Sequence, residues 1–149
     1  MSSHKKEEVI YGDLYLRMFA WFIDISLILI VGWFLSEMII GSFGITDFGI
    51  IWLVKNLTDF ILGFLYFWLM ETITGGKTLG KYVVNIKTVG EKELEPVTPY
   101  RYAVNNLTKS TILLILDIIF GFFLRKGKEK GQIRHTQLLS RTVVIKESQ

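Results

Sequence analysis

The feature that most constrains this chain is a pair of long apolar segments, residues 14–40 and 50–74, joined by a short connection. A helix needs about 20 residues to cross a hydrocarbon core about 30 Å thick, and both segments are long enough. Half of the 149 residues are hydrophobic and the mean hydropathy is +0.39, which is too apolar for a soluble domain of this size. We therefore expect an all-α membrane protein at the cell membrane, with the lipid bilayer as its first partner.

Composition and motifs exclude several other classes. There are 0 cysteines, so disulfide scaffolds and cysteine-ligated metals are excluded, and His4 and His135 are isolated. A net charge of +3 suits anionic lipid headgroups, and no base-reading motif accompanies it, so we expect no nucleic-acid partner. No nucleophile set can be assembled, so we expect neither an enzyme nor a cofactor.

A third apolar run, residues 111–124, leaves the number of spans open. It is 14 residues long and contains Asp117, so it is either a re-entrant or interfacial helix or, if extended, a third transmembrane helix. Residues 41–49 contain no Lys or Arg, whereas residues 75–110 contain six and residues 125–149 contain seven. Positive loops face the cytoplasm. This asymmetry favours two spans with a third helix that returns to the cytoplasmic side.

The cytoplasmic part is expected to carry a small β-rich flap. Residues 81–89 and 142–145 are rich in β-branched side chains and predict two strands, with a charged turn at 90–95 after the first. The expected division is a cytoplasmic tail at 1–13, a transmembrane region at 14–124 with a cytoplasmic hairpin at 75–102, and a basic tail at 125–149 containing a short strand.

Charged residues inside the apolar segments are the candidate functional positions. Arg17 and Asp24 lie seven residues apart and share a helix face. Asp24 and Asp59 are both expected to lie near the bilayer midplane, about 15 and 13 Å from the starts of their helices. Two carboxylates at one depth can bind a cation or share a proton. The structural alternative is that Lys55 neutralises Asp59 as an i,i+4 ion pair.

Three further acidic residues need partners. Glu37 and Glu71 lie near helix ends, where contact with headgroups is the usual role, although Glu71 could also reach Arg17 at the inner depth. Asp117 interrupts the third apolar run and requires Arg17 or a water-filled cavity. The ion- or proton-coupling candidates are Asp24, Asp59, Arg17, Glu71 and Asp117.

The segment 75–81 formally satisfies the start of a phosphate-binding loop, G-x-x-x-x-G-K. Such a loop follows a strand, precedes a helix and has Ser or Thr after the lysine, whereas here a helix precedes, a strand is expected to follow, and residue 82 is Tyr. We interpret the segment as a tight turn that leaves the membrane. Its lysines, Lys77 and Lys81, are expected to contact lipid phosphate or the helix end at Glu71.

The chain resembles the RDD family of small integral membrane proteins. The resemblance rests on Arg17, Asp24, Gly75-Gly76-Lys77-Thr78-Leu79-Gly80-Lys81, Ile86-Lys87-Thr88-Val89 and Thr142-Val143-Val144, in that order. Family members carry an aspartate where this chain has Gln137 and an arginine where it has Asn105, and Asp117 is a candidate for the missing acidic role. The resemblance implies membrane architecture and suggests transport of unidentified ligands, with some members looking like cation/proton antiporters.

Two functional classes therefore stay open. The chain is either an ion- or proton-coupled transporter or transporter subunit, or a nonenzymatic membrane scaffold or assembly subunit. Two or three helices cannot enclose a pathway, so a transporter would act as a homo-oligomer or with another membrane protein.

Overall fold

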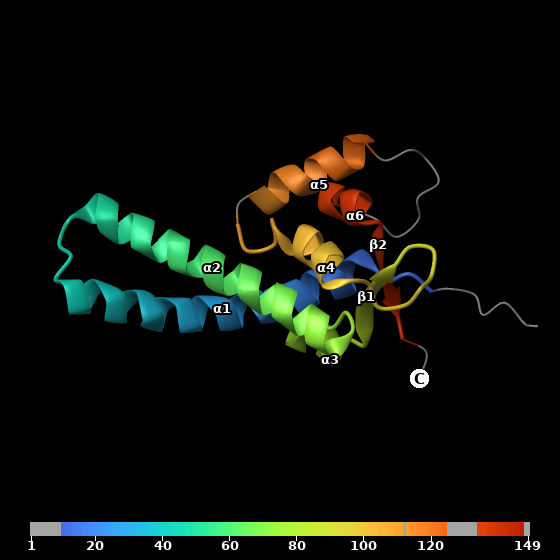
Figure 1. The fold of residues 1–149 in the computed structure, drawn as a ribbon, viewed down its shortest axis with the longest axis horizontal. Coiled ribbons are helices and arrows are strands. Elements are labelled where there is room, and N and C mark those ends of the chain that lie inside the picture. Colours follow the sequence, from blue (N-terminus) through green and yellow to red (C-terminus); the bar gives the residue numbers. More distant parts are fainter. Residues whose placement is uncertain (1–9, 112, 125–133, 148–149) are drawn as a thin grey trace, which may run out of the picture.

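The computed structural model describes residues 10–111, 113–124 and 134–147. Its elements are α1 (Leu14–Phe43), α2 (Phe48–Thr74), α3 (Leu79–Val83), β1 (Ile86–Gly90), α4 (Pro99–Asn106), α5 (Leu113–Leu124), α6 (His135–Ser140) and β2 (Thr142–Lys146). Figure 1 shows α1 and α2 as a long hairpin, with every other element gathered at one end of it. We call this end the sheet end.

The hairpin confirms the two long apolar helices predicted from the sequence. α1 has 30 residues and α2 has 27, so they are about 45 and 40 Å long. Gly44 ends α1 in the left-handed conformation at φ 60°, and the Asp47 carboxylate begins α2 by accepting from Ile50 N at 3.0 Å. Most apolar side chains on both helices are exposed, as expected of helices that face lipid and not of a soluble core.

The predicted β-rich flap is present as a two-stranded antiparallel sheet. β1 pairs with β2 from Ile86 opposite Lys146 to Gly90 opposite Thr142. Tyr11 adds an isolated bridge to Ile145 just before α1 begins. Ala20 of α1 packs with Ile86 and Val144 in a small buried cluster, so the sheet is seated directly on the first turns of the hairpin.

The strand prediction for residues 81–89 is wrong in its first half. Residues 79–83 form the short helix α3, and the strand begins only at Ile86, after Asn85 at φ 55°. The Thr78 hydroxyl caps α3 by accepting from Lys81 N at 3.3 Å, and Asp24 of α1 accepts from Gly80 N at 2.8 Å. The local cap and the tertiary contact with α1 together outweigh the β propensity of Tyr-Val-Val.

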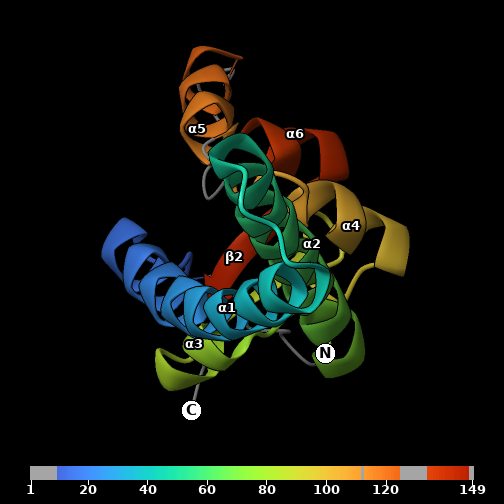
Figure 2. The same cartoon turned by 90° about the vertical axis from the view of Figure 1, so that its left-hand side faces the viewer.

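The third apolar run forms α5, whose 12 residues span about 18 Å and cannot cross a bilayer. Among the residues that the structure describes, only α1 and α2 are long and apolar enough to be candidate spans, which agrees with the two-span alternative. Figures 1 and 2 show α5 and α3 on opposite sides of the hairpin. Asp117 and Gly121 are the buried residues of α5, and its large apolar side chains are exposed.

Parts of the predicted terminal segments lie outside the described residues. This applies to positions 1–9 of the N-terminal tail and to 125–133 and 148–149 of the basic tail. The described part of the basic tail contains the expected strand as β2, preceded by a short helix, α6, that was not predicted.

Candidate functional site

Buried polar side chains gather where the hairpin meets the sheet end. We call this cluster the polar junction, and it comprises Asp24, Glu71, Thr78, Lys81, Thr88, Asn105, Asn106, Lys109, Asp117, Arg134 and Thr136. They come from both long helices, from α3–α6 and β1, and from the connections beside them. A buried charge is tolerated only when it is paired and hydrogen-bonded, so the partners define what each group can do.

Glu71 is the centre of the polar junction and is 0% exposed. Its Oε1 forms ion pairs with the ammonium groups of Lys81 and of Lys109, the latter at 2.7 Å. Its Oε2 accepts from Asn106 Nδ2 at 2.9 Å. Lys81 also contacts the Thr88 hydroxyl on β1. The last turn of α2 is thus bound to α3, α4 and the sheet through one carboxylate.

Lys109 is the less favourably placed of the two lysines. Burial lowers its pKa, and the neighbouring Lys81 and Arg134 act in the same direction, against the attraction of Glu71. Its ammonium also lies 4.9 Å from the centre of the Phe67 ring, close enough for a cation–π interaction. Two ammonium groups meet one carboxylate here, so removal of Glu71 would leave both uncompensated.

Asp24 is 1% exposed and receives three hydrogen bonds. Tyr66 Oη donates at 2.6 Å and Gly80 N at 2.8 Å to Oδ1, and Thr78 Oγ1 donates at 2.6 Å to Oδ2. Both oxygens are therefore occupied by donors from α2 and from the start of α3. This geometry holds a carboxylate in place and joins α1 to the turn that follows α2.

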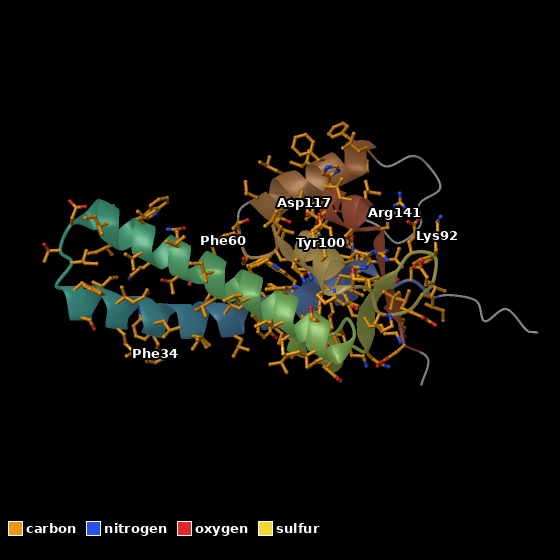
Figure 3. The ribbon with its side chains drawn as sticks, in the orientation of Figure 1. Phe34, Phe60, Lys92, Tyr100, Asp117 and Arg141 are labelled. Carbon is orange, nitrogen blue, oxygen red and sulfur yellow. The ribbon has the colours of Figure 1, made fainter. Side chains whose placement is uncertain are left out.

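Asp117 is bound within the sheet end, whereas the sequence predicts Arg17 or a water-filled cavity as its partner. It accepts from Thr136 N and Thr136 Oγ1, both at 2.7 Å, and from Thr108 Oγ1 at 2.7 Å. Arg134 lies 3.7 Å away and donates to Asn105 Oδ1 at 2.7 Å. Figure 3 shows Asp117 between α5 and α6, which it connects.

The predicted pairing of Asp24 with Asp59 at one depth is wrong. Asp24 lies opposite Tyr66, whereas Asp59 lies opposite Gly32, where an added Cβ would stand 2.0 Å from the Asp59 Oδ1. Eight residues of α1 separate Asp24 from Gly32, which is about 12 Å along the helix. The two carboxylates therefore cannot share one ion or one proton within this chain.

Two other expected contacts also differ. Lys55 forms its ion pair with Glu37 of α1 at 2.8 Å and acts on the predicted partner, Asp59, only as a nearby charge. Arg17 donates to Val144 O of β2 at 3.0 Å, while Glu71 is bound by the two lysines. Arg17 thus ties the first turn of α1 to the sheet.

The glycine-rich segment forms a turn, as predicted, although a short helix follows it. Gly76 has φ 108°, and an added Cβ there would lie 2.0 Å from Thr88 O, so only glycine fits. Lys81 reaches the Glu71 carboxylate, as expected, and Lys77 pairs with Glu147 at 2.5 Å. Both lysines thus form ion pairs with carboxylates.

Sequence reasoning missed the donors of the polar junction. These are Tyr66, Thr78, Asn105, Asn106, Lys109, Arg134 and Thr136. The available signal was the run Asn105-Asn106-Leu107-Thr108-Lys109 directly before an apolar helix, where polar side chains need buried partners. Within the described residues, no three His, Cys, Asp or Glu side chains form a metal-binding group.

A comparison with protein families matches the RDD family over residues 11–133. The chain belongs to the RDD family. The match covers most of the chain, including the hairpin, the glycine-rich turn, β1, α4 and α5. Comparisons with curated proteins and with solved structures give no match.

Within this RDD protein, the two amides at which the sequence resemblance leads us to expect an arginine and an aspartate, Asn105 and Gln137, both bind Arg134. Arg134 N donates to Gln137 Oε1 at 3.2 Å, and the Arg134 guanidinium donates to Asn105 Oδ1. Asp117 stands beside the same guanidinium. An arginine–carboxylate pair is therefore present next to these two amides, supplied by Arg134 and Asp117.

Proposed function

We propose that this RDD protein is a nonenzymatic assembly subunit of the cell membrane, with α1 and α2 as a multi-pass anchor and the sheet end in the cytoplasm. The observation that carries the proposal is the complete engagement of Asp24 and Glu71. Every oxygen of these carboxylates accepts from groups of the sheet end or from Tyr66. Such bonds support a rigid joint between anchor and cytoplasmic layer, not a site that changes its ligand.

The outward surface of the hairpin supports the same role. Large side chains such as Trp33, Phe34 and Trp52 are 55–59% exposed, and Figure 3 labels Phe34 on the hairpin. In a bilayer these side chains contact lipid or the helices of other membrane proteins. Two spans supply too few walls for a pathway, so the hairpin is suited to pack laterally as a homo-oligomer or with a different subunit.

Reconstitution tests this proposal. The purified chain in proteoliposomes is expected to show no sodium, potassium or proton flux above empty liposomes under any cation gradient. Native mass spectrometry from nanodiscs, or subunit counting by photobleaching, is expected to show a defined oligomer. Flux by the chain alone would refute the assembly role, and a strict monomer at all protein-to-lipid ratios would refute self-assembly.

One observation favours the second candidate, an ion- or proton-coupled transporter subunit. Asp59 lies in the hairpin with no hydrogen-bond donor among the described residues, unlike Asp24 and Glu71. A carboxylate that changes its proton or ligand must be free to do so. If wild-type flux is seen, Asp59→Asn is expected to abolish it while Asp47→Asn retains it, and the melting temperatures of both variants should match the wild type.

A further inference from the structure

A half-open cavity of about 270 Å³ lies beside the hairpin, next to the polar junction, and Glu71 does not line it. Trp21, Ile25 and Leu29 of α1 form one wall, and Leu114 and Ile115 of α5 form the other. Its lining is mostly apolar, which is typical of a small-molecule site, where few polar groups fix orientation. The polar groups that reach it are Asp59, Lys109, Ser110 and Thr111.

Asp59 is the group that gives this cavity its chemistry. It is half-buried, and no side chain or backbone N–H of the described residues donates to it. Lys55, four residues earlier on α2, attracts Asp59 electrostatically, but its ammonium is bound to Glu37 at 2.8 Å and forms no ion pair with Asp59. Gly32 leaves room for the carboxylate against α1, because a Cβ at that position would stand 2.0 Å from Oδ1.

The depth of Asp59 makes an unpaired charge costly. It lies 11 residues after Phe48, about 16 Å from the start of α2, and so falls within the hydrocarbon region when the hairpin spans a bilayer. A carboxylate at such a depth needs a proton or a cationic partner.

The lysine at the other end of the cavity does not supply that partner. The ammonium of Lys109 is bound to Glu71 at 2.7 Å and lies 4.9 Å from the Phe67 ring centre. Trp21 is fixed by its indole N–H, which donates to Lys109 O at 3.0 Å. The cavity thus combines one carboxylate that lacks a hydrogen-bond donor with an apolar wall that contains a fixed indole.

We propose that this cavity binds an organic cation with an apolar tail, its ammonium group at Asp59 and its tail along α1 toward Trp21. The carboxylate compensates the charge of the cation, and the aliphatic side chains of α1 and α5 bury the tail. A hydrated inorganic cation would gain nothing from these apolar walls. The site requires neither oligomer formation nor flux, so it is independent of the proposed assembly role.

Binding of hexyltrimethylammonium to the purified full chain in nanodiscs tests the proposal. This probe keeps its charge at every pH, and hexanol serves as the neutral probe of equal tail length. Saturable binding of hexyltrimethylammonium is expected, measured by equilibrium dialysis, together with a change in tryptophan fluorescence. Asp59→Asn retains the shape of the side chain and is expected to weaken binding at least tenfold.

The matched control is Asp47→Asn, which removes a carboxylate from the same hairpin outside the cavity, keeps a capping side chain and should bind the probe like the wild type. Leu29→Trp narrows the cavity without altering Asp59 and should also weaken binding. Equal binding by wild type and Asp59→Asn would overturn the proposal, as would equal binding of hexanol and the cation by the wild type. Melting temperatures of the three variants, expected to match the wild type, separate lost binding from lost folding.

Discussion

Thr78 Oγ1 donates a hydrogen bond of 2.6 Å to Asp24 Oδ2, joining two residues 54 positions apart. The same hydroxyl accepts from Lys81 N, so one threonine both caps α3 and binds α1. Tyr66 and Gly80 complete the set of donors to Asp24. The orientation of the sheet end on the hairpin therefore depends on a carboxylate in the interior of α1.

Loss of the Asp24 charge should destabilise the protein without a specific functional phenotype. Asp24→Asn replaces an acceptor of three hydrogen bonds by an amide whose N–H₂ faces donors, so we expect a loss of about 2–4 kcal/mol in the free energy of unfolding. Thr78→Val should lose about 1–2 kcal/mol, and Thr78→Ser should be near wild type because it keeps the hydroxyl.

Unfolding of these variants in detergent, followed by circular dichroism, measures the effect. Asp13→Asn is the matched control, since the exposed Asp13 side chain makes no capping bond at the start of α1. Wild-type stability of Asp24→Asn would contradict the structural role given to this carboxylate.

Because Glu71 compensates two buried lysines, its substitution should cause a large loss in the free energy of unfolding. Glu71→Gln leaves Lys81 and Lys109 without their carboxylate, and loss of one partner from a buried ion pair costs about 3–5 kcal/mol. Adding Lys109→Met removes one uncompensated ammonium, so the double variant should be more stable than the sum of the two single losses predicts. Strictly additive losses would show that Lys109 and Glu71 do not interact.

The close packing of α3 against α1 at Gly80 can be tested by adding a single methyl group there. A Cβ at Gly80 would lie 2.0 Å from Ala20 O, and neither backbone can yield easily. Gly80→Ala should therefore lose about 3 kcal/mol or fail to fold. Gly41→Ala is the control, because nothing lies within 4 Å of its added Cβ and alanine favours the helix by up to about 1 kcal/mol. Equal melting temperatures for the two variants would refute this contact.

The end of β2 should contribute a small acid-sensitive stabilisation. The hydrogen bond from Lys77, together with Lys87, lowers the pKa of Glu147 below its ordinary value. The stabilisation is therefore fully present above the pKa of the unfolded chain and is lost as pH falls through the lower pKa of the folded chain. The effect is modest because Glu147 is partly exposed to solvent.

Comparing wild type with Glu147→Gln between pH 7 and pH 3 measures this effect. The two should differ in unfolding free energy near neutral pH and converge in acid. Glu95→Gln, an exposed position on the turn after β1, should show no such convergence. A wild-type advantage that grows as pH falls would contradict the predicted sign.

Membrane topology can be tested with single cysteines, since the chain has 0 of its own. In intact cells, Thr46→Cys should react with a membrane-impermeant maleimide, whereas Glu95→Cys should react only after permeabilisation. The expectation follows from the basic residues of the sheet end and their absence from residues 41–49. Labelling of both positions from outside would refute the two-span arrangement.

The sequence by itself determined the two long helices, the side of the membrane expected for the basic regions and the second strand. These features follow from local patterns: apolar length, lysine and arginine asymmetry, and the β-branched run Thr142-Val143-Val144-Ile145. The family match over residues 11–133 agrees with the resemblance seen in the motifs.

Only the tertiary structure decided which groups the buried charges meet. A carboxylate in an apolar segment indicates that hydrogen-bond donors are needed, but the sequence does not identify them. Glu71, for example, binds Lys109, which lies 38 residues away in the sequence. A tertiary contact also helps to form α3 at residues 79–83, where a strand is expected: Asp24 binds the N–H of Gly80, in addition to the local cap by Thr78. Tertiary contacts also separated Asp24 from Asp59, since each is positioned by its neighbours across the hairpin and not by its distance from a helix end.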